Sequence, residues 1–184
     1  PLDKKLILFG ALGGTKDIRK GGDLLIKAIM RLKDFSSDKF IESLELVIVG
    51  DEKDQDQYDL GVKLNYAGVI NNDLILKLYY SACDVFVLPS RQDNLPGTGI
   101  ESHACGTPVV GFEIGGLPEI IDNHVTGALA KPFQENSLAL AIKWVLDKED
   151  SSLCVNARNR ASSLWNPKRI SKMYCDLYSS ILNI

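Results

Sequence analysis

Two carboxylates stand eight positions apart in a glycine- and proline-rich segment that runs from Pro89 to Glu101. Asp93 precedes, and Glu101 follows, the position near Gly97 where a helix is expected to begin. The free N–H groups at the start of a helix can hold an anion such as a diphosphate. Carboxylates on either side of that anion are suited to accept hydrogen bonds from sugar hydroxyls. In the alternative interpretation, Asp93 caps a turn and Glu101 pairs with a neighbour on its helix.

A second segment combines glycine with basic residues. The pair Arg19-Lys20 is followed by Gly21-Gly22 directly before a helical pattern, and Gly13-Gly14-Thr15 lies upstream. A phosphate site can be built this way, because the helix N-terminus carries a partial positive charge. The spacing fits neither G-x-G-x-x-G nor G-x-x-x-x-G-K-[ST]. Taken alone, the segment favours the plainer interpretation, in which the glycines make turns and the basic side chains are solvated.

A third glycine pair, Gly115-Gly116, opens the run Leu117-Pro118-Glu119 at another expected strand end. Its backbone N–H groups can reach the same anion. Alone, this signal is weak.

The elements that must position these residues are read from hydrophobic periodicity. Short apolar runs predict strands at 5–11, 44–50, 64–69, 84–89, 107–111 and 127–130. Helical spacing predicts helices at 22–32, 74–81, 100–105, 135–147, 151–164 and 167–183, with short ones after 57 and at 117–119. Residues 34–43 are polar and are expected to form a loop. This alternation predicts a single α/β domain over 1–184, a Rossmann-like parallel sheet of about six strands with helices on both faces. Ligands of such sheets bind at the carboxyl ends of the strands, where the glycine-rich turns share one cleft.

Composition excludes several classes of protein. The chain has 21 Lys and Arg against 24 Asp and Glu, so a generic nucleic-acid-binding surface is not expected. No apolar run reaches the ~18 residues of a membrane span, and the first residues do not resemble a signal peptide. Four cysteines without a C-x-x-C pair, and only two histidines (His103 and His124), do not predict a zinc site. Reduced structural thiols in a cytoplasmic protein are expected.

Residues 85–130 resemble the signature of family 4 glycosyltransferases of the GT-B fold. The segment PSRQDNLPGTGIESHACGTPVVGFEIGGLPEII has, in family order and spacing, the counterpart of an E-x7-E element with Asp93 in first place, an A-C-G-T-P-V-V strand and a G-G-x-P-E turn. The subgroup with Asp-Asn-Leu-Pro in the first element is similar to sugar transferases of exopolysaccharide and lipopolysaccharide assembly. The resemblance covers nearly the whole chain, which corresponds to the second, donor-binding half of a GT-B enzyme.

The resemblance implies a role for each matching position. Asp93 contacts hydroxyls of the donor sugar and Glu101 holds the ribose, while Lys20 neutralises the diphosphate. Two further groups complete the implied site: the backbone N–H groups of Gly97 and Thr98 at the diphosphate, and the backbone of Gly68, Val69 and Ile70 at the nucleobase.

Three departures from the family pattern bear on this site. The family commonly has Gly-Arg at the end of the first strand, where this chain has Gly10-Ala11, and Arg19 is the candidate replacement. Asp93 is one methylene shorter than the glutamate it replaces. Pro96 stands where the family often has glycine, and it has no N–H to donate.

The implied reaction is retaining transfer from a nucleoside-diphosphate sugar, with no metal ion, no cofactor and no covalent nucleophile. The implied partners are a missing N-terminal acceptor domain and a saccharide or lipid-linked acceptor. The expected place is the cytoplasm, with the full-length protein able to act at the inner face of the membrane. The chain is expected to be a piece of a longer protein, and an apolar stripe on its last helix, from Ile170 to Ile181, is expected to pack on its own domain or on the missing half.

Three other functions stay open. A GT-B-fold sugar-nucleotide epimerase would bind the same donor but transfer nothing. A non-catalytic binding or regulatory module is compatible with the altered first strand and with Asp93. A nicotinamide-dependent enzyme would share the sheet, although the first turn lacks its fingerprint.

Overall fold

The computed structural model describes residues 3–10, 17–50 and 60–182. Its centre is a six-stranded sheet in which every neighbouring pair of strands is parallel. The strand order is β3-β2-β1-β4-β5-β6, so the direction of winding reverses between β1 and β4. The strands are β1 (Lys5–Gly10), β2 (Leu44–Val49), β3 (Lys63–Tyr66), β4 (Val85–Leu88), β5 (Val109–Phe112) and β6 (Gly127–Ala130). The predicted Rossmann-like α/β fold is confirmed.

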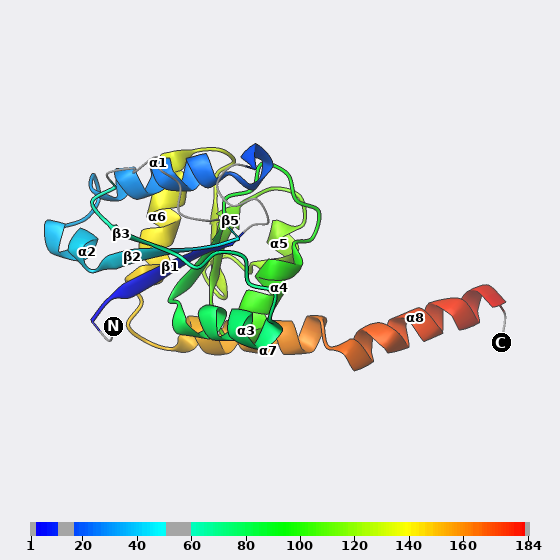
Figure 1. Ribbon diagram of the computed structural model, residues 1–184. Helices are drawn as coiled ribbons and strands as arrows, with labels where there is room; N and C mark the ends of the chain where they lie inside the picture. The colour runs from blue at the N-terminus through cyan, green and yellow to red at the C-terminus, as the bar shows by residue number, and fades with distance from the viewer. Residues whose placement is uncertain (1–2, 11–16, 51–59, 183–184) are drawn as a thin grey trace.

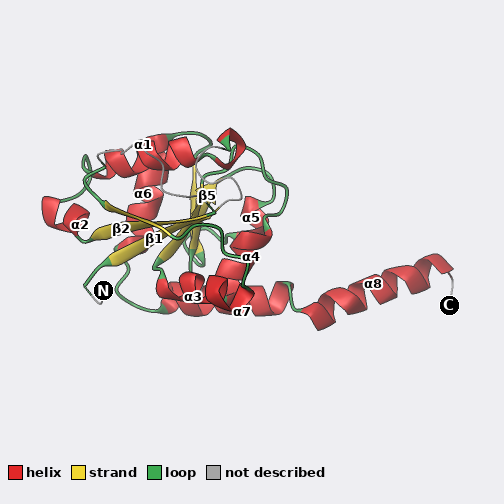
Figure 2. Ribbon diagram, viewed as in Figure 1, coloured by secondary structure: helices red, strands yellow, loops and turns green. Residues whose placement is uncertain are grey.

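Helices cover both faces of the sheet (Figure 1 and Figure 2). On one face α1 (Gly22–Leu32) packs against α6 (Glu135–Leu146), and on the other α4 (Gly97–Ala104) packs against α3 (Asp73–Ala82) and α7 (Ser152–Leu164). The smaller helices are η2 (Ile18–Lys20), α2 (Asp38–Glu42) and α5 (Leu117–Ile120), and the chain continues into α8 (Pro167–Leu182).

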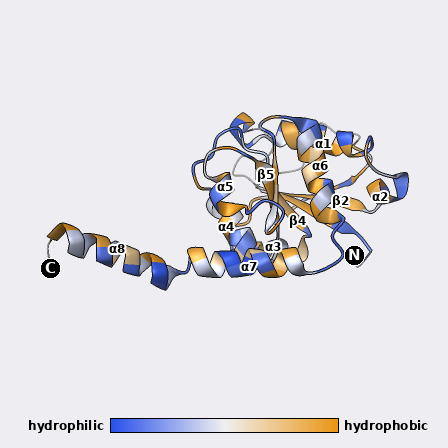
Figure 3. Ribbon diagram, turned by 180° about the vertical axis from the view of Figure 1, so that it is seen from behind, coloured by the Kyte–Doolittle hydropathy of each residue, from blue (hydrophilic) through white to orange (hydrophobic). Residues whose placement is uncertain are grey.

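The apolar strands form the core between the two helical layers (Figure 3). Along β1, Ile7 and Phe9 join the cluster that includes α1 and α6, whereas Leu8 joins the cluster that includes Tyr80 of α3. This alternation follows from the two-residue period of a strand. Because both faces are covered, all of β2, β4 and β5 is buried, which explains why Glu45 in β2 is the one charged residue among them.

The prediction of a loop over residues 34–43 is wrong for its second half. Residues Asp38–Glu42 form helix α2, and the Oγ atom of Ser37 caps it by accepting a hydrogen bond from the N–H of Phe40 at 3.3 Å. Ile41 is the buried residue of this helix. One cap and one buried side chain hold this single turn, which is too short to show a helical period in the sequence.

The third strand is shorter than expected and ends at Tyr66 instead of residue 69. Gly68 adopts a positive φ of 67°, which turns the chain out of the strand, and its carbonyl accepts a hydrogen bond from the N–H of Gly50. The predicted turn Gly13-Gly14-Thr15, the end of the first strand at Ala11 and the expected turn at 51–57 lie outside the described residues.

Helix α8 projects away from the rest of the domain (Figure 1). None of its residues is buried, and the apolar stripe is exposed: Met173, Tyr174, Leu177, Tyr178 and Ile181 are each between 52% and 66% accessible. The stripe was expected to pack either on its own domain or on a missing half. It does not pack on its own domain. No helix in the described part of the chain is long and apolar enough to cross a membrane.

Candidate functional site

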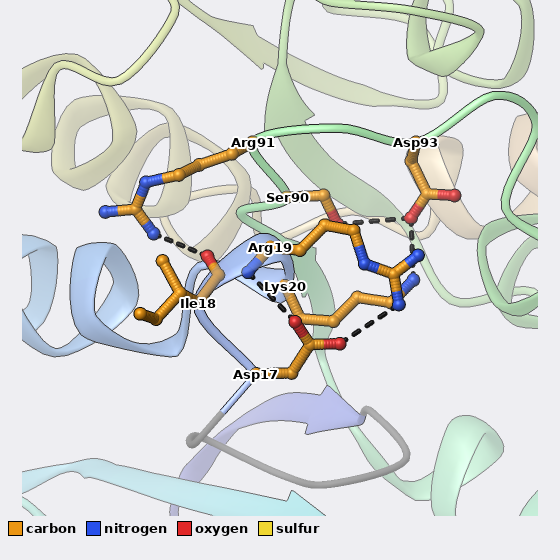
Figure 4. A network of polar contacts seen from close by, with 7 residues as sticks. All are labelled: Asp17, Ile18, Arg19, Lys20, Ser90, Arg91 and Asp93. Carbon is orange, nitrogen blue, oxygen red and sulfur yellow. Dashed lines mark hydrogen bonds and ion pairs between the residues drawn. The ribbon is translucent and has the colours of Figure 1, made fainter.

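The two residues predicted to be catalytic meet at the carboxyl edge of the sheet. Lys20, in the turn η2 before α1, lies with its Nζ atom 2.8 Å from Oδ2 of Asp93, which is in the loop between β4 and α4. The side chains are 25% and 15% exposed, so both are largely shielded from water. The hydroxyl of Ser90 donates to the same carboxylate oxygen at 3.2 Å (Figure 4). The structure thus joins two residues that are 73 positions apart.

Arg19 lies beside this pair but is bound elsewhere. Its backbone N–H and its guanidinium both donate to the carboxylate of Asp17, at 3.0 Å each (Figure 4). These contacts hold the pKa of Asp17 below its usual range. The Arg19 side chain is still 60% exposed, which leaves it accessible to a ligand at this edge.

Helix α4 begins at Gly97, where the loop pattern placed its start, and so before the span of 100–105 that periodicity predicted. Pro96 occupies the N-cap position and provides no side-chain hydrogen bond to the first turn. The backbone N–H groups of Gly97 and Thr98 therefore have no capping side chain, which is the condition that favours anion binding at a helix N-terminus. The turn packs tightly against the sheet, because a Cβ atom at Gly99 would lie 2.9 Å from Leu88 Cδ1.

Glu101 is held by a residue that the sequence analysis did not identify. The hydroxyl of Tyr80, on α3, donates to Oε2 of Glu101 at 3.3 Å. Tyr80 is only 3% exposed, and its ring lies edge-on to Phe86 with centroids 5.3 Å apart. Burial, followed by the charge of Glu101, raises the pKa of Tyr80 far above its usual value, so the phenol stays protonated and donates.

A hollow of about 340 Å³ lies beside this hydrogen bond. Its lining residues are Asp73, Leu76, Lys77, Tyr80, Glu101, Ala104 and Cys105. The Glu101 carboxylate is exposed toward solvent while its partner Tyr80 is buried. A ligand hydroxyl can therefore reach Glu101 without displacing the phenol.

The segment expected to meet a nucleobase, Gly68-Val69-Ile70, follows the carboxyl end of β3 and so lies at the same edge. Val69 is 55% exposed, so its apolar side chain is accessible to a flat ring such as a nucleobase. Because β2 stands between β3 and β1, this segment is set apart from the ion pair of Lys20 and Asp93.

The glycine pair before α5 packs directly on the loop that carries Asp93. A Cβ atom at Gly115 would lie 2.0 Å from the carbonyl oxygen of Asp93, and one at Gly116 would lie 1.9 Å from that of Asn94. Only glycine allows so close an approach. These glycines therefore shape the site through the position of the neighbouring loop.

The remaining titratable candidates lie away from this edge. His103 is fully buried, and its Nε2–H donates to the carbonyl of Thr126 at 3.1 Å, so its role is in packing. A larger hollow, of about 590 Å³, lies near the amino ends of the strands and is lined by Cys83, Cys105 and Cys154 among others. Burial raises the pKa of the Cys83 thiol to about 12, so it stays protonated.

Across the part of the chain that the structure describes, no three His, Cys, Asp or Glu side chains are grouped to hold a metal ion.

A parallel sheet of order 3-2-1-4-5-6 defines a Rossmann-like fold, and the structural neighbours make it one half of a GT-B fold. The chain belongs to the family described as Glycosyl transferases group 1, which matches residues 3–163. It is a glycosyltransferase domain and corresponds to the C-terminal half of the GT-B fold.

Among curated relatives, an uncharacterized glycosyltransferase of Methanocaldococcus jannaschii is 36% identical over 149 residues, which cover 78% of this chain and 36% of the relative. A D-inositol 3-phosphate glycosyltransferase of Xylanimonas cellulosilytica is 30% identical over 139 residues, covering 70% of this chain and 31% of the relative. The sucrose-phosphate synthase of Thermosynechococcus elongatus superposes with a TM-score of 0.81 at 30% identity, covering 100% of this chain and 47% of that chain. The chain thus spans about a third of these curated relatives.

Proposed function

We propose that this domain binds the nucleoside-diphosphate sugar of a retaining glycosyltransferase. The observation that carries the proposal is the ion pair of Lys20 with Asp93 at the carboxyl edge, beside the uncapped start of α4. A cation and free N–H groups suit a diphosphate. The carboxylates of Asp93 and Glu101 suit the hydroxyl groups at its two ends.

Each residue has a distinct part in this proposal. Lys20 and the N–H groups of Gly97 and Thr98 hold the diphosphate, with Arg19 close enough to assist. Glu101 accepts from the ribose and Asp93 from the donor sugar. The backbone of residues 68–70 contacts the nucleobase.

In the transfer step, the bond between the anomeric carbon and the diphosphate oxygen breaks. Positive charge builds on the sugar ring and negative charge on the leaving diphosphate. Lys20 and the helix N–H groups stabilise the leaving group, which is electrostatic catalysis by groups already in place. The oxygen of the acceptor hydroxyl then bonds to the anomeric carbon on the face that the diphosphate left, and its proton passes to the leaving phosphate oxygen.

The acceptor site would lie on another half of the same polypeptide. The relatives are roughly two to three times as long as this chain, which leaves room for such a half. The exposed stripe of α8 would dock on it, because Met173, Leu177 and Ile181 form an apolar face that nothing in the described part of the chain covers. A saccharide or lipid-linked acceptor, a role in polysaccharide or lipopolysaccharide assembly and a cytoplasmic location complete the proposal.

The test is titration calorimetry of the 184-residue chain with UDP, GDP and NAD. We expect a nucleoside diphosphate to bind and NAD to bind more weakly. Lys20→Ala should abolish most of this binding, whereas Lys63→Ala should not. Lys63 is a matched control, because it also forms an ion pair, with Glu45 at 3.2 Å, but at the amino edge of the sheet. Binding of NAD alone would contradict the proposal.

Catalysis requires the full-length protein. There, Lys20→Ala should lower the turnover number about 100-fold or more, as loss of a single charge-stabilising donor does in other enzymes. The configuration at the anomeric carbon of the product, followed by NMR, distinguishes retention from inversion. Donor binding without any transfer to a panel of acceptors would favour the epimerase or the binding module.

A further inference from the structure

We propose that Arg91 and Asp23 are positioning residues that hold Lys20 against Asp93, and so set the geometry of the proposed diphosphate site. The inference rests on the proposed function. Arg91 and Asp23 form a polar clamp between two segments that are far apart in the sequence.

The clamp is bidentate. The Nη1 and Nη2 atoms of Arg91 donate to Oδ1 and Oδ2 of Asp23, each at 2.7 Å. Asp23 lies in the first turn of α1, directly after the Lys20 turn, and Arg91 lies in the loop that carries Asp93. Parallel paired bonds of this kind fix orientation as well as distance.

Two further contacts tie the same segments together. Nη1 of Arg91 also donates to the carbonyl of Ile18 at 2.7 Å (Figure 4). The backbone N–H of Arg91 donates to the carbonyl of Arg19 at 2.8 Å. Both acceptors belong to η2, the turn that ends at Lys20. The loop is therefore bonded to the carbonyls of the two residues that precede Lys20.

Beside the clamp, the backbone at Gly21 lies directly against the backbone at Pro89. Gly21 has a φ of 71°, and a Cβ atom there would lie 1.9 Å from the carbonyl oxygen of Pro89. The two segments approach at a distance that only glycine permits. A shift of the turn relative to the loop would therefore move Lys20 relative to Asp93.

The turn needs such a clamp because apolar packing does not hold it. None of the residues of η2 is buried, and Ile18 is 73% exposed. The polar contacts of Arg91 replace the hydrophobic anchor that a longer helix would have. The hydrogen bonds to Arg91 lower the pKa of Asp23, and those to Asp23 raise that of Arg91, so the clamp is ionised at neutral pH.

Arg91 is not itself placed to bind the diphosphate. Its guanidinium points toward Ile18, away from the pair of Lys20 and Asp93 (Figure 4). Both of its terminal nitrogens already donate to protein oxygens. Its influence on a ligand must therefore pass through the position of Lys20.

The experiment is a double-mutant cycle on the 184-residue chain, read by calorimetry with UDP and with uridine. Asp23→Asn and Arg91→Lys each remove the bidentate geometry while keeping the size of the side chain. Each should weaken UDP binding by about 3- to 30-fold, which lies within the range of coupling energies of neighbouring residues. Uridine binding should stay the same, because uridine has no phosphate for Lys20 to hold. In a Lys20→Ala background, neither substitution should weaken UDP binding further.

The control is Glu45→Gln, which removes a carboxylate that accepts from Asn65 at 2.8 Å and pairs with Lys63 at the opposite edge. It should lower the melting temperature without changing UDP affinity. Losses from Asp23→Asn or Arg91→Lys that persist in full in the Lys20→Ala background would overturn the inference, and so would unchanged UDP binding in both single variants. If Lys20→Ala itself leaves UDP affinity intact, the proposed diphosphate site fails first, and the inference fails with it.

Discussion

The ammonium group of Lys20 and the carboxylate of Asp93 neutralise one another across 2.8 Å. A diphosphate that binds Lys20 must therefore compete with Asp93, which is itself a candidate to bind the sugar. Donor binding would release the carboxylate at the moment when a sugar hydroxyl arrives to take up its hydrogen bonds.

The first prediction follows from this competition. Asp93→Asn should strengthen the binding of bare UDP several-fold, because Lys20 loses its internal partner, but should lower the turnover of the sugar nucleotide in the full-length enzyme. Calorimetry with UDP and a transfer assay provide the two measurements. Parallel losses in both would mean that Asp93 only shapes the loop.

The second prediction concerns the ribose. Glu101→Gln should weaken nucleotide binding by roughly 1–3 kcal/mol, because a charge-assisted hydrogen bond is lost. Tyr80→Phe should have a smaller effect in the same direction, since it removes only the hydroxyl that holds Glu101 at 3.3 Å. Both effects should shrink for a nucleotide whose ribose lacks its 2′ and 3′ hydroxyls. If Glu101→Gln unfolds the domain and leaves the affinity of the folded fraction unchanged, Glu101 is a structural residue.

The third prediction is a dependence of stability on pH. Burial lowers the pKa of His103 to about 4, so the folded state resists protonation while the unfolded state takes up a proton near pH 6.5. The free energy of unfolding should therefore fall by about 3 kcal/mol from this group as the pH drops from 6.5 to 4. His103→Gln removes this titrating group. The difference in free energy of unfolding between wild type and variant should therefore narrow as the pH drops from 6.5 to 4. Chemical denaturation at several pH values measures this difference in free energy of unfolding. If it does not change with pH, His103 is protonated in the folded domain.

The fourth prediction concerns α8. Removing residues 167–184 should change the free energy of unfolding of this domain by no more than about 0.5 kcal/mol, because no residue of α8 is buried. In the full-length enzyme, Leu177→Asp should impair transfer by separating this domain from the proposed acceptor half. Lys172→Asp, a charge change on the same helix outside the apolar stripe, is the matched control. Loss of domain stability on truncation would show that α8 packs on its own domain.

Local sequence determined most of the fold. The strands and long helices occur where apolar periodicity predicted them, because a two-residue or 3.6-residue repeat is written in neighbouring residues. Periodicity placed this helix at 100–105, whereas a start of α4 near Gly97 was predictable only from the glycine- and proline-rich segment before it. Helix α2 was not, since it depends on the cap at Ser37 and on the burial of Ile41, which arises only once the domain has folded.

The residue types of the site were also visible in the sequence, as the two carboxylates and the Arg-Lys-Gly-Gly turn. Their partners were not. Lys20 meets Asp93 across 73 positions, and Arg91 meets Asp23 across 68. Such pairs form only when the parallel sheet brings its carboxyl ends to one edge. The sequence therefore determined which chemistry this edge can carry, and the tertiary structure alone decided which charge faces which, because long-range pairing leaves no periodic signal in the chain.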